Sequence, residues 1–74
     1  MKITVKLFAS FRTGRTPIEE REYPAGTRVA DIVAERGIPV TELGIIMVNS
    51  RHVPLDRELA DGDTLALFPL LGGG

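Results

Sequence analysis

The 74-residue sequence predicts an α+β fold, in which a mixed sheet of four to five strands is covered by one main helix. Residues 2–9 and 64–68 alternate between apolar and polar side chains, which is the period of a half-buried strand. Residues 29–36 instead carry apolar side chains at helical spacing. A chain this short supports a single hydrophobic core, and one helix packed on one sheet is enough to form it.

The first predicted strand, residues 2–9, has two different faces. Aliphatic side chains at every second position from Ile3 to Leu7 predict the buried face. The opposite face carries lysines and a threonine, with Phe8 as an aromatic exception. A polar connection that contains Gly and Pro leads to a weaker second strand, residues 18–23, so the two strands predict an N-terminal hairpin.

The predicted helix follows Thr27, a residue type that is favoured at the N-cap position. Its apolar positions from Val29 to Val33 predict the helix face that packs on the sheet. Gly37 fits the left-handed position after the last turn, and Pro39 prevents the helix from resuming.

Two further strands are predicted before the last one. Residues 44–49 are apolar and rich in β-branched side chains, which predicts a buried strand. Residues 52–55 predict a short edge strand, the position in a sheet where Pro54 is tolerated. The acidic stretch 56–63 lacks the spacing of a calcium loop, so we expect a solvated turn there and no metal site.

The last predicted strand, residues 64–68, repeats the pattern of the first. Leu65 and Leu67 share one face, and Phe68 lies on the other. With one helix in the middle of the chain, the first and last strands can pair as parallel neighbours at the sheet centre, which is the β-grasp, or ubiquitin-like, arrangement. This pairing places Phe8 beside Phe68 on the face away from the helix, and paired exposed aromatic rings predict a patch on which a partner docks.

Residues 1–68 are predicted to form this β-grasp domain, and residues 69–74 a flexible tail that ends in Gly-Gly-Gly. Glycines have no Cβ, so a narrow active site can close around their bare backbone. The six tail residues reach about 20 Å when extended, enough to enter a buried pocket of a partner. An ordinary frayed terminus is the alternative explanation.

The composition argues against several classes of function. Nine Lys and Arg residues against ten Asp and Glu residues give a net charge of −1, which argues against nucleic-acid binding. The absence of Cys excludes a thiolate metal site and a thiol nucleophile, and His52, the only histidine, has no nucleophile beside it in the sequence. Lys6 interrupts any signal-peptide core, and no apolar run approaches the ~20 residues of a membrane span, so we expect a soluble, cytoplasmic protein.

Three stretches together resemble the MoaD/ThiS family of small sulfur carriers: VKLFASFR (5–12), VNSRHVPLDRELADGD (48–63) and LALFPLLGGG (65–74). The resemblance covers nearly the whole chain. LFASFR and the Phe-Pro pair before the tail are more similar to the small subunit of molybdopterin synthase. The third terminal glycine is more typical of the thiazole-forming carriers, which keeps that alternative open.

The resemblance implies that Gly74 is the modified residue. In this family the terminal carboxylate is adenylated by an ATP-using, ubiquitin-activating-like enzyme of the MoeB/ThiF type and is then converted to a thiocarboxylate. The carrier itself binds no cofactor and is not an enzyme. The resemblance also implies that the residues before Gly74 enter the active site of the partner: Pro69, Leu70, Leu71, Gly72 and Gly73.

The partner that the resemblance implies is the large subunit of molybdopterin synthase, which makes the pterin of molybdenum and tungsten cofactors. Three alternatives stay open. The same chemistry would serve thiazole synthase in thiamine synthesis. A ubiquitin-like modifier would instead join Gly74 to a lysine through an isopeptide bond. A β-grasp interaction module would carry an inert tail.

Overall fold

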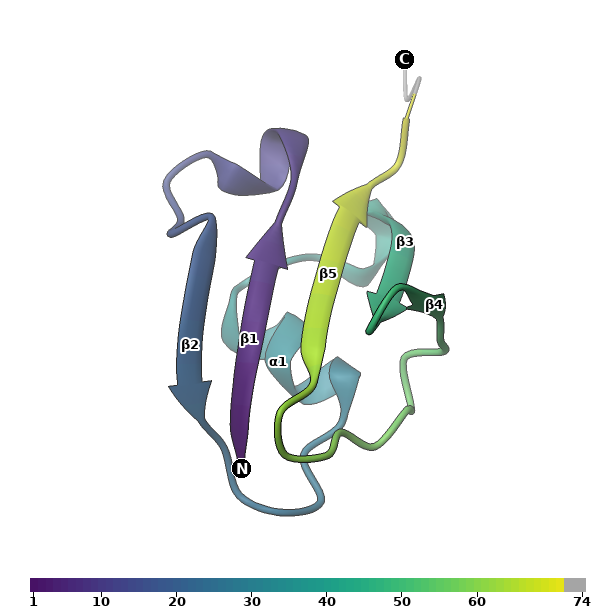
Figure 1. Cartoon of the computed structure of the whole chain (residues 1–74). Coiled ribbons are helices and arrows are strands. Elements are labelled where there is room, and N and C mark those ends of the chain that lie inside the picture. The colour runs from purple at the N-terminus through teal and green to yellow at the C-terminus, as the bar shows by residue number, and fades with distance from the viewer. Residues whose placement is uncertain (72–74) are drawn as a thin grey trace.

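The computed structural model describes residues 1–71. Along this range the chain forms five strands, one α-helix and two short 3-10 helices, in the order β1 (Lys2–Leu7), η1 (Ala9–Arg12), β2 (Ile18–Glu22), α1 (Val29–Glu35), η2 (Val40–Glu42), β3 (Leu43–Val48), β4 (Arg51–His52) and β5 (Thr64–Pro69). Figure 1 shows α1 lying across one face of the sheet, while no element of residues 1–71 covers the opposite face.

The strands form one mixed sheet in the order β2-β1-β5-β3-β4. β1 and β5 pair in parallel at its centre, and the other neighbours pair antiparallel. The predicted α+β fold and its parallel central pair are therefore confirmed, and the arrangement is that of a β-grasp. In Figure 1 η1 and the end of the described chain lie at the same end of the sheet. None of the helices in residues 1–71 is long and apolar enough to cross a membrane.

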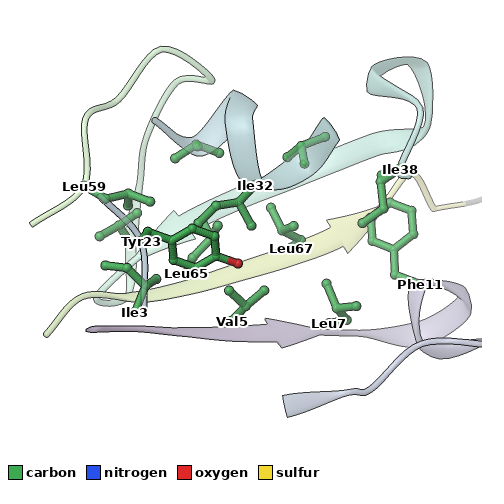
Figure 2. Packing of buried hydrophobic residues seen from close by; sticks show 13 residues of the cluster. Ile3, Val5, Leu7, Phe11, Tyr23, Ile32, Ile38, Leu59, Leu65 and Leu67 are labelled. Carbon is green, nitrogen blue, oxygen red and sulfur yellow. The ribbon is translucent and has the colours of Figure 1, made fainter. Parts of the chain in front are cut away.

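The hydrophobic core fills the space between α1 and the covered face of the sheet (Figure 2). The alternating aliphatic side chains of β1 and β5 point into it, as their period predicts, and are almost completely buried. Ile32 meets them from α1. Burying an aliphatic side chain of this size contributes about 1.5–3 kcal/mol, so this cluster dominates the stability of the domain.

Phe11 belongs to the core, although the sequence placed it in a polar connection. It lies in η1, is only 2% exposed, and points toward Ile38 in Figure 2. A single aromatic residue in a polar segment carries no periodic signal, so nothing in the local pattern indicates its burial. η1 was likewise not predicted.

The helix begins one residue later than Thr27 suggests, because Arg28 occupies the N-cap position. The Thr27 hydroxyl instead donates to the carbonyl of Pro24, at 2.8 Å. The first two helical N–H groups donate to the carbonyls of Arg57 (3.0 Å) and Leu55 (2.9 Å). Because the loop before β5 satisfies these donors, the helix does not need the side chain of Thr27 as a cap. The prediction of Thr27 as the N-cap is wrong.

β3 and β4 also differ from the sequence prediction. β3 was expected to be buried, yet Val48 is its only fully buried residue, and Ile45 is 36% exposed. The reason is that none of the helices in the described part of the chain covers the outer face of the sheet, so alternate residues of an antiparallel strand face water. β4 is limited to Arg51–His52, and Pro54 follows it instead of lying within it.

The fold extends one residue beyond the predicted domain end at residue 68. Pro69 is the last residue of β5, is buried, and lies opposite Leu43 of β3. The N–H of Leu70 then donates to the carbonyl of Glu42, at 2.9 Å. The tail therefore leaves the fold after Leu70, while Gly72, Gly73 and Gly74 lie outside the described residues.

Candidate functional site

The parallel pairing of β1 with β5 brings Phe8 and Phe68 together on the outer face of the sheet. Leu7 lies opposite Leu67 in the register, so the next residue of each strand projects to the other face at the same level. The two rings stack with their centroids 4.2 Å apart and an angle of 11° between their planes. Both side chains are half-buried, less exposed than the sequence suggested.

The two rings line a groove on this outer face, with a volume of about 430 Å³. Ala66 and Met47 continue its apolar surface toward β3, and Lys6 contributes from β1. The groove is apolar where the two rings, Ala66 and Met47 line it, and polar where Asn49, Ser50 and Thr64 do. A concavity that combines apolar and polar lining is a typical site for an inserted side chain of a partner.

Two residues of this surface were missed by the sequence prediction. Ile45 lies directly opposite Phe68 in the register, and Met47 lies opposite Ala66, so both face outward with the aromatic pair. If the faces of β3 are alternated back from the buried Val48, instead of being taken as all buried, Met47 and Ile45 fall on the outer face. We call Phe8, Ile45, Met47 and Phe68 the outer patch.

Cationic side chains lie along the β1 side of the outer patch. The guanidinium carbon of Arg12 lies 5.8 Å from the centre of the Phe8 ring, and Lys6 lines the groove. Within residues 1–71 neither of them forms an ion pair. The patch is therefore apolar at its centre and positively charged on one side.

The acidic stretch that carries the family resemblance forms a structural network. Asp63 is only 7% exposed, and its carboxylate accepts hydrogen bonds from the Asn49 side chain (2.9 Å) and the N–H of Ala60 (2.8 Å). The side-chain oxygen of Asn49 in turn accepts from the N–H of Thr64, at 2.9 Å. Among residues 1–71 no group of acidic or histidine side chains is arranged to hold a metal. These residues hold β3 and β5 together.

Titratable groups with shifted pKa values lie on the helix side of the sheet, away from the outer patch. Burial raises the pKa of Tyr23, and its 2.6 Å hydrogen bond to the Glu35 carboxylate raises it further. Burial lowers the pKa of Arg36, but hydrogen bonds with Tyr23 and Glu19 outweigh this effect and raise it above its ordinary value. This cluster joins α1 to β2 and contacts no residue of the outer patch.

The root of the tail lies at the same end of the sheet as the aromatic pair. Of the predicted tail residues, Pro69 is part of β5, Leu70 is 57% exposed and Leu71 is 84% exposed. A partner that covered these two apolar side chains would gain the free energy of removing them from water. The glycines after Leu71 fall beyond the described residues, so their predicted roles remain predictions.

The comparison with protein families finds one match that spans this whole arrangement. Residues 5–74 match the ThiS family, from β1 through the terminal glycines. Among solved structures, a protein of Pyrococcus furiosus assigned as molybdopterin converting factor subunit 1 is 36% identical, with a TM-score of 0.76. The match covers 93% of this chain and 97% of that one.

More distant structures share the fold. Small archaeal modifier protein 1 of Haloferax volcanii is 22% identical over 100% of both chains, with a TM-score of 0.74. A structure of subunits 1 and 2 of the molybdopterin-converting factor of Helicobacter pylori, in complex, contains a chain that is 18% identical over 100% of both chains, with a TM-score of 0.67. At these identities the likeness is one of fold.

Proposed function

We propose, from the premise that this chain belongs to the ThiS family of ubiquitin-like sulfur carriers, that its Gly74 carboxylate becomes a thiocarboxylate for molybdopterin synthesis. The observation that supports the carrier chemistry is the family match, which runs from residue 5 to residue 74 and includes the terminal glycines. The chain is a small carrier subunit and not an enzyme, so the catalytic groups belong to its partners.

The proposed chemistry suits a chain without cysteine, because sulfur then needs another attachment point, and the main-chain carboxylate offers one as a thiocarboxylate. A carboxylate oxygen of Gly74 attacks the α-phosphorus of ATP on a MoeB/ThiF-type enzyme, and pyrophosphate leaves. The sulfur of sulfide then attacks the acyl carbon and AMP leaves, which yields the thiocarboxylate. Adenylation is needed because a free carboxylate has no good leaving group.

The outer patch is the surface that we assign to docking of the partners. Its stacked rings are half-buried and stand beside a groove, and aromatic and methionine side chains are enriched at the cores of interfaces. The patch and the root of the tail lie at the same end of the sheet. A partner that covers the patch would therefore receive Leu70 and Leu71 at its surface and the glycines in its active site.

The pathway is the finer part of the proposal. The 36% identity to the Pyrococcus furiosus subunit 1 favours molybdopterin synthesis, with a large synthase subunit as the second partner. The fold shared with the Haloferax volcanii modifier protein is equally compatible with the alternative, in which Gly74 is joined to lysines of other proteins. The third terminal glycine favours thiazole synthesis, the other carrier role. Exposed Leu70 and Leu71 suit insertion into one apolar pocket better than presentation to many lysines.

The proposal is tested by changing the end of the chain by one residue. We expect a variant lacking Gly74, and a second variant with one residue added after it, to form no thiocarboxylate with the activating enzyme, ATP and sulfide. Thermal unfolding of both variants should match the parent, because the tail leaves the fold after Leu70. Adenylation of the extended variant at the parental rate would overturn the proposed role of Gly74.

A further inference from the structure

We infer that Gly44 is a positioning residue, which sets the direction in which the tail leaves the fold; the inference rests on the function proposed above. A Cβ atom at Gly44 would lie 2.6 Å from the carbonyl oxygen of Pro69, 2.9 Å from its carbonyl carbon and 3.0 Å from the Cα of Leu70. All three atoms belong to the backbone at the root of the tail. A backbone cannot rotate out of the way as a side chain can, so glycine alone allows this approach.

The backbone conformation of Gly44 offers no other reason for a glycine. The glycines with positive φ in residues 1–71 are Gly14, Gly26, Gly37 and Gly62. Gly44 lies inside a strand, where glycine is unfavourable because it adds conformational entropy to the unfolded chain and has no side chain to pack. Its role is therefore the close contact with Pro69.

Gly44 is also the residue at which the pairing of β3 with β5 changes register. Leu43 lies opposite Pro69 and Ile45 lies opposite Phe68, so Gly44 is the extra residue between them. An extra residue of this kind bends the strand that contains it. Here it brings the β3 backbone under the Pro69 carbonyl.

Two further contacts fix the chain at this point. Pro69 is buried, and its ring restricts its own φ. The N–H of Leu70 donates to the carbonyl of Glu42, at 2.9 Å. The Pro69 carbonyl thus lies close against the backbone of Gly44, and the N–H of Leu70 is hydrogen-bonded to the carbonyl of Glu42. The four residues from Leu71 to Gly74 span at most about 14 Å, which limits how far Gly74 can lie from this point.

This short reach makes the direction of the root important for Gly74. An alanine at position 44 would force the β3 backbone and the Pro69 carbonyl apart by at least 0.4 Å, from 2.6 Å to the 3.0 Å below which Cβ contacts essentially never occur. Because misplacement of a reacting group by about 1 Å can cost 10²-fold in rate, we expect a loss of about tenfold. The loss should appear in kcat, because docking through the outer patch does not need the tail.

The first test compares Gly44→Ala with the parent in adenylation kinetics, using the activating enzyme and ATP. We expect kcat to fall about tenfold while KM changes by less than about twofold. Gly26→Ala is the matched control, since it makes the same chemical change at a loop glycine with φ +91° and nothing within 4 Å. It should lose stability through strain and keep the kinetics of the parent.

The second test measures amide hydrogen exchange and needs no enzyme. In the parent, the Leu70 amide should exchange at least about tenfold more slowly than the Leu71 amide, because only Leu70 is hydrogen-bonded to Glu42. In Gly44→Ala, protection at Leu70 should be lost while the amides at the centre of β5 stay protected. If this variant does not fold, exchange in the parent still tests whether Leu70 is fixed at the root of the tail.

The outcomes separate this inference from the proposed function. Equal exchange at Leu70 and Leu71 in the parent, or a parental kcat in Gly44→Ala, would overturn the positioning role and leave the carrier function intact. If the parent is not adenylated but its Leu70 amide is protected from exchange as expected, the proposed function is overturned and the fixed position of Leu70 is supported.

Discussion

Replacing Phe68 with alanine removes half of the stacked pair at the centre of the outer patch. Truncation of a fully buried phenylalanine costs about 3–5 kcal/mol, and the half-buried Phe68 ring should contribute about half of that. This estimate includes the stacking interaction with Phe8, whose ring centroid lies 4.2 Å away with an angle of 11° between the planes. We expect Phe68→Ala to lower the free energy of unfolding by about 2 kcal/mol, measured by chemical denaturation.

The same variant should weaken binding to the activating enzyme. An aromatic anchor in an interface contributes more than ~1 kcal/mol, which corresponds to a factor of about five or more in Kd. Isothermal titration calorimetry with the activating enzyme measures this directly. Phe8→Ala should behave alike, and the double variant should lose less than the sum of the two, because the rings contact each other.

Leu55→Ala provides the control for these variants. Leu55 is partly buried and packs against the core outside the outer patch, so its truncation should destabilise the fold without changing affinity. The docking role of the patch would be disproved by a loss of about 3–5 kcal/mol in stability together with an unchanged Kd for Phe68→Ala. That result would make the aromatic pair a second core and not a docking surface.

Two further predictions concern the scaffold. The raised pKa of Tyr23 means that the folded state holds the phenol proton more tightly than the unfolded chain does. The contribution of this proton to stability is therefore complete below pH 10.0, and it is lost as the pH rises through the pKa that Tyr23 has in the folded state. Since Tyr23 is the only tyrosine and there is no tryptophan, absorbance of the phenolate should titrate above pH 10.0, and a midpoint at or below this value would contradict the burial argument. Asp63→Ala should cost about 2 kcal/mol of stability, because the N–H of Ala60 loses its buried acceptor. Adenylation of the protein that remains folded should stay at the parental rate. A loss of adenylation without a loss of folding would instead assign Asp63 to the docking surface.

The parts of the fold that local periodicity determines were predictable from the sequence. Alternation in β1 and β5 identified the buried faces, and the parallel pairing of these strands placed Phe8 beside Phe68. Both features depend on which way each side chain points along its own strand, which the period of two fixes. The centre of the candidate docking surface could therefore be located before the structure was known.

The features that depend on long-range contacts could not be predicted. The helix start depends on the carbonyls of Leu55 and Arg57, and no local signal at Thr27 reveals them. The burial of Phe11 depends on how η1 folds onto the core. The role of Gly44 depends on its contact with Pro69, far along the chain, so the root of the tail was misjudged by one residue.

Whether the terminal carboxylate carries sulfur is decided by the mass of the C-terminal peptide from protein isolated out of its native cells. We expect the peptide that ends in Gly74 to be unbranched and heavier by the difference between one sulfur and one oxygen atom. Treatment with an alkylating reagent should label this peptide, since a thiocarboxylate is nucleophilic and the chain has no cysteine. Recovery of the same peptide mainly joined to lysines of other proteins, with no oxygen-to-sulfur shift, would contradict the carrier function and establish a modifier.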